Sequence, residues 1–454
     1  MIFIRLVNQI DNNVTITQQY SFVDTAKTGR STMKLALIGA GQRGMIYAEY
    51  AYFKKGAQIV AIVEPHAERR KIAAEKFRVA DEFCFTCVEE FFAKGKVADA
   101  LILASMDKDH YAQTMASLDC GYDILLEKPV SPDPKECLQI AKKAKELDRK
   151  IVVCHVLRYT NFFSKIKEIV DSGTLGRIVA INHSENVGNF HIAHSFVRGN
   201  WRRSDQSSPI IMQKSCHDMD ILAWIVDSEA KKIASFGSLR HFREENAPEG
   251  SAERCLDCKV ADKCQYHAVK SYMPVRGGWP ATLLGPDQSE AGIMKALETS
   301  PYGRCVYRCD NDVCDHQVTI IEFKNGVNVN FTLSGFTNRM CRTIKIMCEY
   351  GEIYADDDGD IIEITRFNSN FNEQINKTLI RTAQVEGFHG GGDSLLMEDF
   401  ISSMEGKTAE NRTSIARSVE SHIMAYAAEL SRVTGKVVDI DELKAELQKE
   451  TNDG

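Results

Sequence analysis

The sequence predicts an α/β protein of two domains: a doubly wound parallel sheet, followed by an α/β domain whose strands are mostly antiparallel. The chain has 454 residues, more than a single hydrophobic core normally holds. In its first third, short apolar strands alternate with helices, a pattern typical of parallel sheets. Beyond it, the strand-like segments alternate apolar and polar residues, as strands with one buried face do.

Composition and charge argue against several classes of partner. Hydrophobic residues make up 44% of the chain and charged residues 26%, as in ordinary globular proteins. The net charge is −7 and the chain has no long basic run, which argues against nucleic acid or an anionic membrane. No apolar run approaches the roughly 18 residues needed to cross a bilayer. We therefore predict neither a nucleic-acid nor a membrane partner.

The start of the chain does not have the pattern of a secretory leader, because no basic region precedes an apolar core and a small-residue cleavage site. Residues 1–32 are expected to form an extension ahead of the first domain, which starts at Met33. The chain has 14 cysteines. Without a leader, they predict a cytoplasmic protein whose thiols are free or bound to metal.

The segment “KLALIGAGQRG” (34–44) predicts a strand, a glycine turn and the start of a helix. Gly39, Gly41 and Gly44 match the G-x-G-x-x-G pattern of dinucleotide-binding turns. The first glycine permits a tight turn, the second admits a pyrophosphate, and the third lets the helix pack on the strand. The free N–H groups of the helix would then bind the phosphates. The alternative is an ordinary glycine turn.

The next predicted strand, 57–64, ends on Glu64, 20 residues after Gly44. An acid at this place accepts hydrogen bonds from the adenosine ribose and disfavours a 2′-phosphate. The sequence therefore predicts NAD as the cofactor. Arg69 and Arg70 follow closely and keep NADP as the alternative.

The alternation continues with helices over 67–77 and 109–120 and strands over 98–105 and 122–127. This pattern predicts a Rossmann-type sheet, in which ligands bind beyond the carboxyl ends of the strands. The last of these strands runs into “LLEKPVSP” (125–132), which brings a lysine to that edge. The predicted cofactor-binding residues are Gly39, Gly41, Gln42, Arg43, Gly44, Glu64, Ser105, His110, Glu127 and Lys128.

Lys128 is the first candidate catalytic residue. A lysine at a strand's carboxyl end beside a bound nicotinamide is placed to contact the oxygen on the reacting carbon and to move its proton. Pro129 would restrict Lys128 to extended conformations. The alternative is a surface lysine at the end of a strand.

Four segments carry a resemblance to a known family: “LIGAGQRG”, “ALILASMDKDH”, “LLEKPVSP” and “CHDMDIL”. Their order resembles that of the Gfo/Idh/MocA oxidoreductases, the group of glucose–fructose oxidoreductase and inositol dehydrogenase, over residues 33–440. The resemblance implies an NAD(P)-binding Rossmann domain (33–155) and a second α/β domain (156–440) with a large open sheet that mediates oligomer contacts. We therefore expect a homo-oligomer, either a dimer or a tetramer. Residues 441–454 are expected to form a tail after the second domain.

The same resemblance implies oxidation or reduction of a sugar or cyclitol carbon, with Lys128 contacting substrate and cofactor. The family usually has an aspartate four residues before its catalytic histidine, but here Gln213 precedes His217. Glutamine cannot take a proton, so His217 is left as the best general base. Lys214 adds a cation nearby. The alternative for His217 is a helix-start histidine that pairs with Asp218 or Asp220.

The second domain is expected to hold the substrate. The sequence predicts strands over 176–188, 232–242, 317–336 (with a hairpin turn at Asn325-Gly326) and 343–357, and a helix over 414–435. “CHVLRY”, “HIAHSFVRGNWRRS” and “GFHGGGDS” supply polar, aromatic and glycine residues suited to a polyhydroxylated ligand, although each could be a solvated loop. The predicted substrate-binding residues are His155, Arg158, Arg198, Trp201, Lys214, His217, His389 and Asp393.

A cysteine-rich insertion near 250–315 predicts a structural zinc site. Cys255, Cys258 and Cys264 form a C-x2-C with a third thiol close by, and Cys305 or Cys309 would complete a tetrahedral set. Four thiolates leave no open position for chemistry. The alternatives are an iron–sulfur cluster and unligated thiols.

These observations lead to three functional hypotheses. The first is an NAD-dependent dehydrogenase that oxidises a hydroxyl of a sugar, a glycoside or a cyclitol. The second is an NAD-dependent glycoside hydrolase that oxidises a sugar carbon transiently so that a glycosidic bond is eliminated. The third is a non-catalytic NAD-binding regulator, which the presence of both Lys128 and His217 disfavours.

Overall fold

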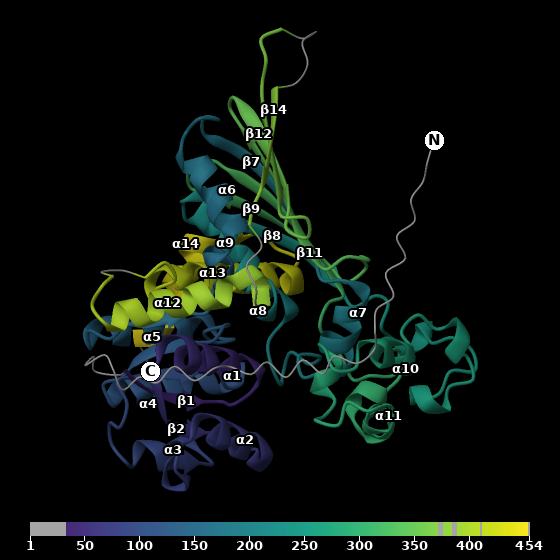
Figure 1. Ribbon diagram of the computed structural model, residues 1–454. Helices are drawn as coiled ribbons and strands as arrows, with labels where there is room; N and C mark the ends of the chain where they lie inside the picture. The colour runs from purple at the N-terminus through teal and green to yellow at the C-terminus, as the bar shows by residue number, and fades with distance from the viewer. Residues whose placement is uncertain (1–32, 371–375, 384–387, 409–410, 453–454) are drawn as a thin grey trace, which may run out of the picture.

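The computed structural model describes residues 33–370, 376–383, 388–408 and 411–452. The predicted extension over residues 1–32 lies outside these described residues. The chain folds into a first domain, a second domain and a lobe (residues 239–315) that is inserted between two strands of the second domain (Figure 1). Within the described part of the chain, no helix combines the length and the apolar character needed to span a bilayer.

The first domain is built on a parallel six-stranded sheet with the order β3-β2-β1-β4-β5-β6. This order confirms the predicted doubly wound fold. The sequence does not predict β3, because a strand of two residues is too short to show a periodic pattern. The strands are β1 (Lys34–Ile38), β2 (Gln58–Val63), β3 (Cys84–Phe85), β4 (Ala100–Leu103), β5 (Asp123–Leu126) and β6 (Ile151–Val153).

The helices of this domain follow the predicted alternation. Ordinary helix signals set some of their ends: Asp133 accepts a hydrogen bond from Lys135 N at 2.9 Å, and Pro134 begins α5. The helices are α1 (Gln42–Glu49) with its continuation η2 (Tyr50–Lys54), α2 (Ala67–Phe77), α3 (Val88–Phe92), α4 (His110–Asp119) and α5 (Pro134–Glu146).

The second domain is built on a nine-stranded sheet with the order β14-β13-β12-β11-β7-β10-β9-β8-β15. Among the described residues only β7 and β10 pair in parallel, which confirms a mostly antiparallel sheet. The strands are β7 (Ile178–Asn186), β8 (Ala230–Ser238), β9 (His316–Phe323), β10 (Asn328–Ser334), β11 (Cys341–Cys348), β12 (Gly351–Asp356), β13 (Ile361–Arg366), β14 (Asn376–Arg381) and β15 (Val438–Asp439).

The two faces of this sheet differ. Helices pack on the buried face and lie between the sheet and the first domain (Figure 1). On the outer face, Phe236 of β8 is 69% exposed and Ile320 of β9 is 54% exposed, while their chain neighbours point inward. The helices outside the lobe are η5 (Val156–Tyr159), α6 (Asn161–Asp171), α7 (Asn189–His191), η6 (Ile192–Arg198), α8 (Ile210–Gln213), α9 (Cys216–Val226), η13 (Phe388–Gly391), α12 (Gly392–Met404), α13 (Ile415–Thr434) and α14 (Ile440–Asn452).

Two C-terminal helices join the domains. α13 packs on β8 and α9 of the second domain and on α5 of the first, and it ends at Gly435, as predicted. α12 packs against α1, so residues late in the chain reach the glycine turn. The segment predicted as a tail contains α14, whose Leu443 and Leu447 are buried because they face α5 and β8.

The lobe lies beside the first domain, below α7 in Figure 1. It contains no strand of either sheet, and its own apolar cluster is small: Cys255, Ala268, Tyr272, Ala281, Ile293 and Leu297. Its helices are η7 (Glu244–Asn246), η8 (Cys255–Asp257), η9 (Ala261–Lys263), α10 (Ala268–Tyr272), η10 (Met273–Val275), η11 (Ala281–Leu283), α11 (Glu290–Thr299) and η12 (Pro301–Gly303).

Candidate active site

The glycine turn between β1 and α1 has room for a phosphate. A Cβ at Gly39, whose φ is 89°, would lie 2.5 Å from Ala104 O, and a Cβ at Gly44 would overlap Gly39 O. These two glycines let the turn pack tightly. A Cβ at Gly41 would meet no atom within 4 Å, and Gly41 is the N-cap of α1 without a side-chain cap. The free N–H groups of α1 therefore face open space, as dinucleotide binding requires.

Glu64 lies at the carboxyl end of β2 and reaches this turn. Its Oε2 accepts a hydrogen bond from Ala40 N at 2.9 Å, and its Oε1 accepts one from His66 N at 2.9 Å. Arg70 donates to the carbonyl oxygens of Glu64, at 2.6 Å, and Pro65, at 3.2 Å. The acid thus has the position that was predicted for a ribose contact. The turn and this acid together fit an adenine dinucleotide.

The loops after β4 and β5 hold each other in place at the same edge of the sheet. His110 is almost fully buried, and its Nδ1 forms a hydrogen bond with Pro129 O at 2.8 Å. Ser105 Oγ donates to Gln113 at 2.6 Å. The Lys128–Pro129 peptide bond is cis. His110 therefore fixes the backbone directly behind Lys128.

Lys128 connects this edge to the second domain. Its Nζ donates a hydrogen bond to Gln213 O at 2.7 Å, at the end of α8 and just before the helix that carries His217. Its backbone N–H donates to Glu127 Oε2 at 2.7 Å. The two predicted catalytic residues are therefore brought to one place from separate domains.

An ion-pair network fixes the residues around Lys128. Arg43, on α1, donates from Nε to Glu127 Oε1 at 2.8 Å and forms an ion pair with Asp393 on α12. His389 Nδ1 lies 3.0 Å from the same aspartate. Burial alone would raise the pKa of Glu127, but the charges of Arg43 and Lys128 outweigh it and lower this pKa. Glu127 is thus a carboxylate fully engaged with protein donors.

His217 is buried among cations and other histidines. It is 6% exposed, and its Nδ1 has no hydrogen-bond partner among the described residues. Its ring centroid is 5.8 Å from that of His155 and 6.2 Å from that of His389. Burial, followed by the charge of Lys128, lowers the pKa of His217 well below its usual value. The imidazole is therefore neutral at neutral pH, and the same burial and cations disfavour its protonated form.

Neither acid on α9 pairs with His217, contrary to the alternative considered from the sequence. Asp218 accepts from Arg342 Nε at 2.8 Å and lies 2.8 Å from His183 Nε2. Asp220 forms a two-bond ion pair with Arg158, at 2.7 Å for each bond. Both carboxylates are occupied by other partners.

Further cations surround the cleft. Lys214 Nζ lies 3.7 Å from Glu185, which also pairs with Arg342. Burial lowers the pKa of Lys214, although the charge of Glu185 opposes this. The motifs of the sequence do not identify Arg342 and Glu185 as site residues. Both are charged residues at buried positions of strands, and such residues usually have a partner or a function, so this pattern could have identified them.

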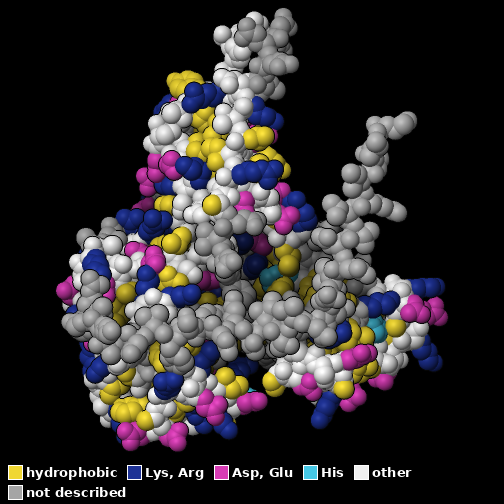
Figure 2. All heavy atoms as spheres, in the orientation of Figure 1, with side chains coloured by type: hydrophobic (Ala, Val, Ile, Leu, Met, Phe, Trp, Pro, Cys, Tyr) yellow, Lys and Arg dark blue, Asp and Glu magenta, His cyan; other side chains and the backbone are white. Residues whose placement is uncertain are grey.

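A cavity of about 410 Å³ opens beside these residues, a size typical of ligand pockets. Its lining includes polar residues of the second domain, among them Asn161, Arg342, Asp357 and His389. Burial raises the pKa of Asp357 to about 6, although Arg342 opposes the shift. In Figure 2 the surface is hollowed between the second domain and the lobe, and histidine is visible in the hollow.

The other predicted substrate residues lie at different places. His155 is buried beside His217 and His422, whereas the guanidinium of Arg158 is engaged by Asp220. Arg198 and Trp201 lie where η6 meets the lobe: Arg198 bonds to lobe residues, and the Trp201 ring is 6.2 Å from that of Phe196. Substrate contacts at these residues stay predictions. Gln42 is exposed at the start of α1.

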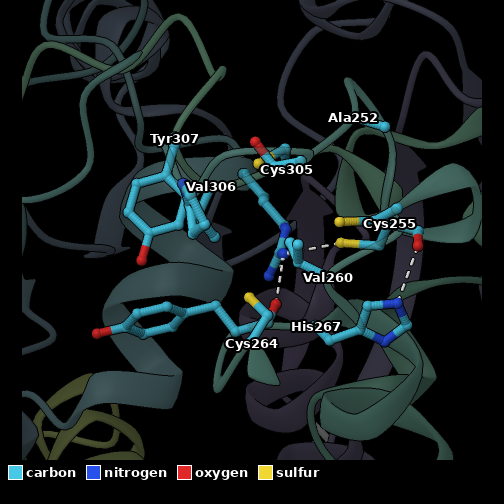
Figure 3. Close-up of a pocket in the computed structure, with 13 residues that line it drawn as sticks. Ala252, Cys255, Val260, Cys264, His267, Cys305, Val306 and Tyr307 are labelled. Atoms are coloured by element: carbon cyan, nitrogen blue, oxygen red, sulfur yellow. Dashed lines mark hydrogen bonds between the residues drawn. The ribbon is translucent and has the colours of Figure 1, made fainter. Parts of the chain in front are cut away.

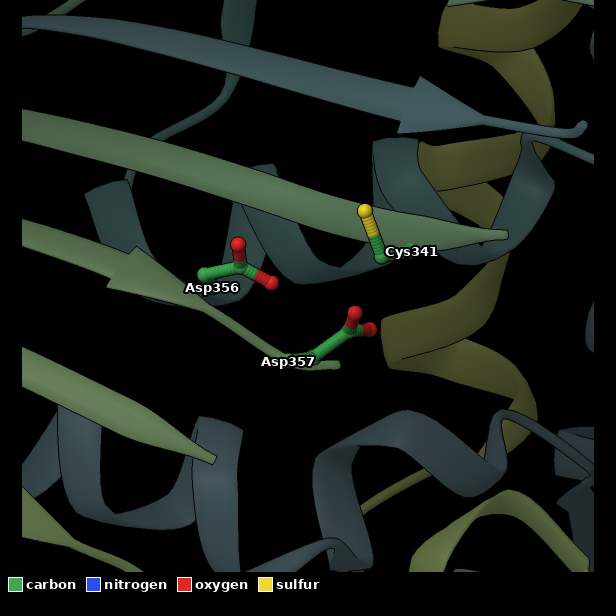
Figure 4. A group of neighbouring side chains, drawn as sticks. All are labelled: Cys341, Asp356 and Asp357. Carbon is green, nitrogen blue, oxygen red and sulfur yellow. The ribbon is translucent and has the colours of Figure 1, made fainter. Parts of the chain in front are cut away.

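A second group of potential ligands lies where β11 begins and β12 ends (Figure 4). Ligand atoms of Cys341, Asp356 and Asp357 lie within 4.8 Å of one another. Arg339 forms an ion pair with Asp356 and donates to Cys341 Sγ at 3.5 Å, while Arg342 N donates to Asp357 at 2.6 Å. Protein cations and donors already satisfy this group.

We expect the free energy of unfolding to fall as the pH drops below about 6.5, the pKa of an unperturbed histidine. Burial lowers the pKa of His155 and His217 well below this value and that of His422 to about 3. The unfolded chain therefore binds more protons than the native protein below pH 6.5. The contribution of each such histidine to the slope approaches about 1.4 kcal/mol per pH unit well below pH 6.5.

Urea unfolding between about pH 7 and pH 5 measures this slope. His422 accepts from Val130 N at 2.8 Å and has Ser418 O at 2.8 Å from its other ring nitrogen, so it is native only in its neutral form. His422→Gln should therefore have a slope shallower by about one histidine's contribution. Equal slopes for the variant and the wild type would contradict the expectation.

Among curated relatives, YteT of Bacillus subtilis (strain 168) is 24% identical over 366 residues, 77% of this chain and 83% of YteT. Inositol 2-dehydrogenase of Corynebacterium glutamicum is 26% identical over 204 residues, 44% of this chain and 56% of that enzyme. The chain thus spans about half the length of this inositol dehydrogenase.

Solved structures share the fold. An oxidoreductase of Agrobacterium radiobacter, in complex with NAD⁺, L-tartaric acid and magnesium, has a TM-score of 0.65 at 16% identity, covering 91% of this chain and 100% of that one. The myo-inositol 2-dehydrogenase of Lactobacillus plantarum has a TM-score of 0.61 at 16% identity, covering 90% and 99%.

Family models match both domains. Residues 33–155 match the model described as “Oxidoreductase family, NAD-binding Rossmann fold”, and residues 167–440 match “Oxidoreductase family, C-terminal alpha/beta domain”. These matches cover more than half of the chain and confirm the resemblance that the motifs carry. The chain therefore belongs to the Gfo/Idh/MocA family of oxidoreductases, and its first domain is an NAD-binding Rossmann fold.

Proposed function

We propose that the chain is an NAD-dependent dehydrogenase that oxidises a hydroxyl of a sugar, a glycoside or a cyclitol. One observation carries this proposal: the Lys128 ammonium group donates to Gln213 O and so lies beside the helix of His217, at the edge of the sheet where the glycine turn also opens. NAD, when bound in that turn, would accept a hydride from the hydroxyl-bearing carbon.

The two catalytic residues have complementary roles. Burial and nearby cations keep His217 neutral. In the proposed reaction it accepts the hydroxyl proton as the carbonyl forms, although the same cations disfavour its charged form. Lys128 donates a hydrogen bond to the same oxygen as negative charge develops on it. Lys214 and Arg342 add positive charge in this region. No carboxylate pairs with His217 among the described residues, and Gln213 offers only its backbone carbonyl to Lys128.

The character of the neighbouring pocket supports the proposed substrate class. The cavity of about 410 Å³ has donors and acceptors rather than a continuous apolar wall, including Asn161, Asp357 and His389. Such a lining suits a ligand with several hydroxyl groups. Relatives named inositol 2-dehydrogenase support the same class. Glu64 at the turn favours NAD over NADP, since Arg70 is engaged by backbone carbonyls.

Lys128→Ala should lower kcat by about 10²- to 10⁴-fold, because it removes a donor that acts on the reacting oxygen. NAD binding should persist, since the glycine turn and Glu64 are untouched. Steady-state formation of reduced cofactor measures the first effect, and calorimetric titration with NAD measures the second.

Lys142→Ala is the matched control, because Lys142 is exposed on α5 in the same domain. It should have wild-type turnover. Normal turnover by Lys128→Ala, on a substrate that the wild type oxidises, would remove Lys128 from the mechanism.

A second candidate reaction uses the same residues. In NAD-dependent glycoside hydrolysis, the oxidised carbon would be reduced again after elimination, and no reduced cofactor would accumulate. Gln213 stands where the family usually has an acid, and this departure is the reason to test the second reaction as well. Following glycoside cleavage and reduced cofactor in the same sample separates the two reactions.

Gly41→Ala should weaken NAD binding by about tenfold or more, equivalent to about 1.4 kcal/mol, without unfolding the protein. Its Cβ would meet no protein atom within 4 Å, so the added methyl group occupies only the space that a pyrophosphate needs.

Gly44→Ala is the contrasting variant, because its Cβ would overlap Gly39 O. It should lower the melting temperature, whereas a stable Gly44→Ala protein would contradict the packing of this turn.

We also propose that the outer face of the nine-stranded sheet joins copies of the chain. Phe236 lies directly opposite Val318 in the sheet, and Ile320 lies two residues further along β9, so all three are exposed on one face. The double variant Phe236→Glu and Ile320→Glu should lower the molar mass measured by light scattering to that of one chain. Val433→Glu, at an exposed site on α13, should leave the mass unchanged. A monomeric wild type would exclude this interface.

A further inference from the structure

Four cysteines of the lobe line one small cavity. Cys255, Cys258, Cys264 and Cys305 all contribute to it, and its volume is about 10 Å³. Figure 3 shows Cys255, Cys264 and Cys305 approaching this space from three sides. None of the four belongs to the active-site cleft described above. They are also the residues whose spacing predicts a metal site.

The backbone fixes where these cysteines lie. Cys258 N donates to Cys255 O at 3.2 Å, and Cys264 N donates to Ala261 O at 3.3 Å, so the first three thiols stand on two successive short turns. Cys305 N donates to Glu253 O at 2.8 Å, beside an antiparallel bridge between Arg254 and Arg304. The fourth thiol is therefore tied to the first although 50 residues separate them in the sequence.

A buried cation lies among these thiols without an acid to balance it. Arg198 is 1% exposed and donates to Arg304 O at 2.7 Å, to Tyr266 O at 2.7 Å and to Cys255 Sγ at 3.5 Å. In the described part of the chain no carboxylate forms an ion pair with it. A buried charge is unfavourable unless it is paired. Four cysteines of the lobe lie around it, and as thiolates they could balance its charge.

The surroundings contain further unused donors. Arg254 Nε and Arg304 Nε are buried without hydrogen-bond acceptors among the described residues, and each arginine precedes one of the four cysteines. Arg304 also forms an ion pair with Asp310 through Nη1, at 2.7 Å. Its Nε and that of Arg254 are therefore donors to which sulfur acceptors could be added.

We propose that Cys255, Cys258, Cys264 and Cys305 bind one zinc ion as thiolates. Four thiol protons pass to solvent, four sulfur–zinc bonds form, and no electron is transferred. The resulting centre has two negative charges, which neutralise Arg198 and offer sulfur acceptors to the unused donors. With four protein ligands the ion has no open position, so its role is structural.

The four thiols stand further apart than the ligands of a bound zinc ion. No three of the four sulfur atoms lie within 4.8 Å of one another among the described residues, whereas sulfurs bound to one zinc at about 2.3 Å are closer. Zinc binding would therefore require the two turns and Cys305 to move together.

The proposed centre would also stiffen the contact between the lobe and η6. Arg198 ends η6, and His191 directly precedes that helix. The ring centroid of His191 is 5.1 Å from that of Trp279 in the lobe. Loss of the ion should therefore loosen both the lobe and this contact.

The test is metal analysis of the full chain, purified without chelators and without a metal-affinity step. We expect about one zinc ion per chain, and release of that zinc when a mercurial reagent titrates about four thiols. Cys258→Ser and Cys264→Ser should each reduce the zinc content at least about tenfold and lower the melting temperature by about 5 °C or more. Thiol titration of the wild type keeps the test valid if a variant fails to fold.

Two control variants sharpen the result. The double variant Cys84→Ser and Cys87→Ser removes the other C-x2-C pair of the chain, which lies in the first domain, and should keep its zinc. Cys309→Ser distinguishes the fourth ligand: it keeps its zinc if Cys305 is the ligand and loses it if Cys309 is. Protein without zinc, with a melting temperature unmoved by chelator, or protein containing iron and sulfide, would overturn the proposal.

Discussion

The constraint on which the site depends is the ion-pair network of Arg43, Glu127 and Asp393. Arg43 belongs to the helix that follows the glycine turn, Glu127 directly precedes Lys128, and Asp393 begins a helix of the C-terminal part of the chain. A buried carboxylate or guanidinium is stable only with its partner in place. The network therefore sets the glycine turn, the lysine and the second domain in one fixed relation.

The electrostatic character of the cleft follows from this arrangement. The acids near Lys128 form ion pairs with arginines: Glu127 pairs with Arg43, and Asp218 pairs with Arg342. Burial lowers the pKa of His155 and His217, so both are neutral near neutral pH, whereas His183 and His389 lie beside Asp218 and Asp393. In the proposed reaction, the Lys128 ammonium group, which also donates to Gln213 O, would stabilise a substrate oxygen that loses its proton.

The lobe shows a different solution to stability. Its short helices enclose few apolar side chains, so it has little core of its own. Arg198 extends from η6 into it and bonds to two backbone carbonyls of the lobe. As thiolates, the thiols around this arginine would balance its charge, and the arginine itself connects the lobe to η6.

The sequence by itself determined the local features: β1, the glycine turn and α1, the bounds of α2, the hairpin at Asn325-Gly326, and Lys128 at the end of a strand. Periodicity and turn chemistry specify these within a few residues. Only the tertiary structure decided which charges meet. Asp393 lies 350 residues from Arg43 in the chain, Asp220 binds Arg158 rather than His217, and Arg342 enters the site from a strand that carried no motif. Which charged side chains form ion pairs depends on which elements pack together, and a local sequence pattern does not specify that packing.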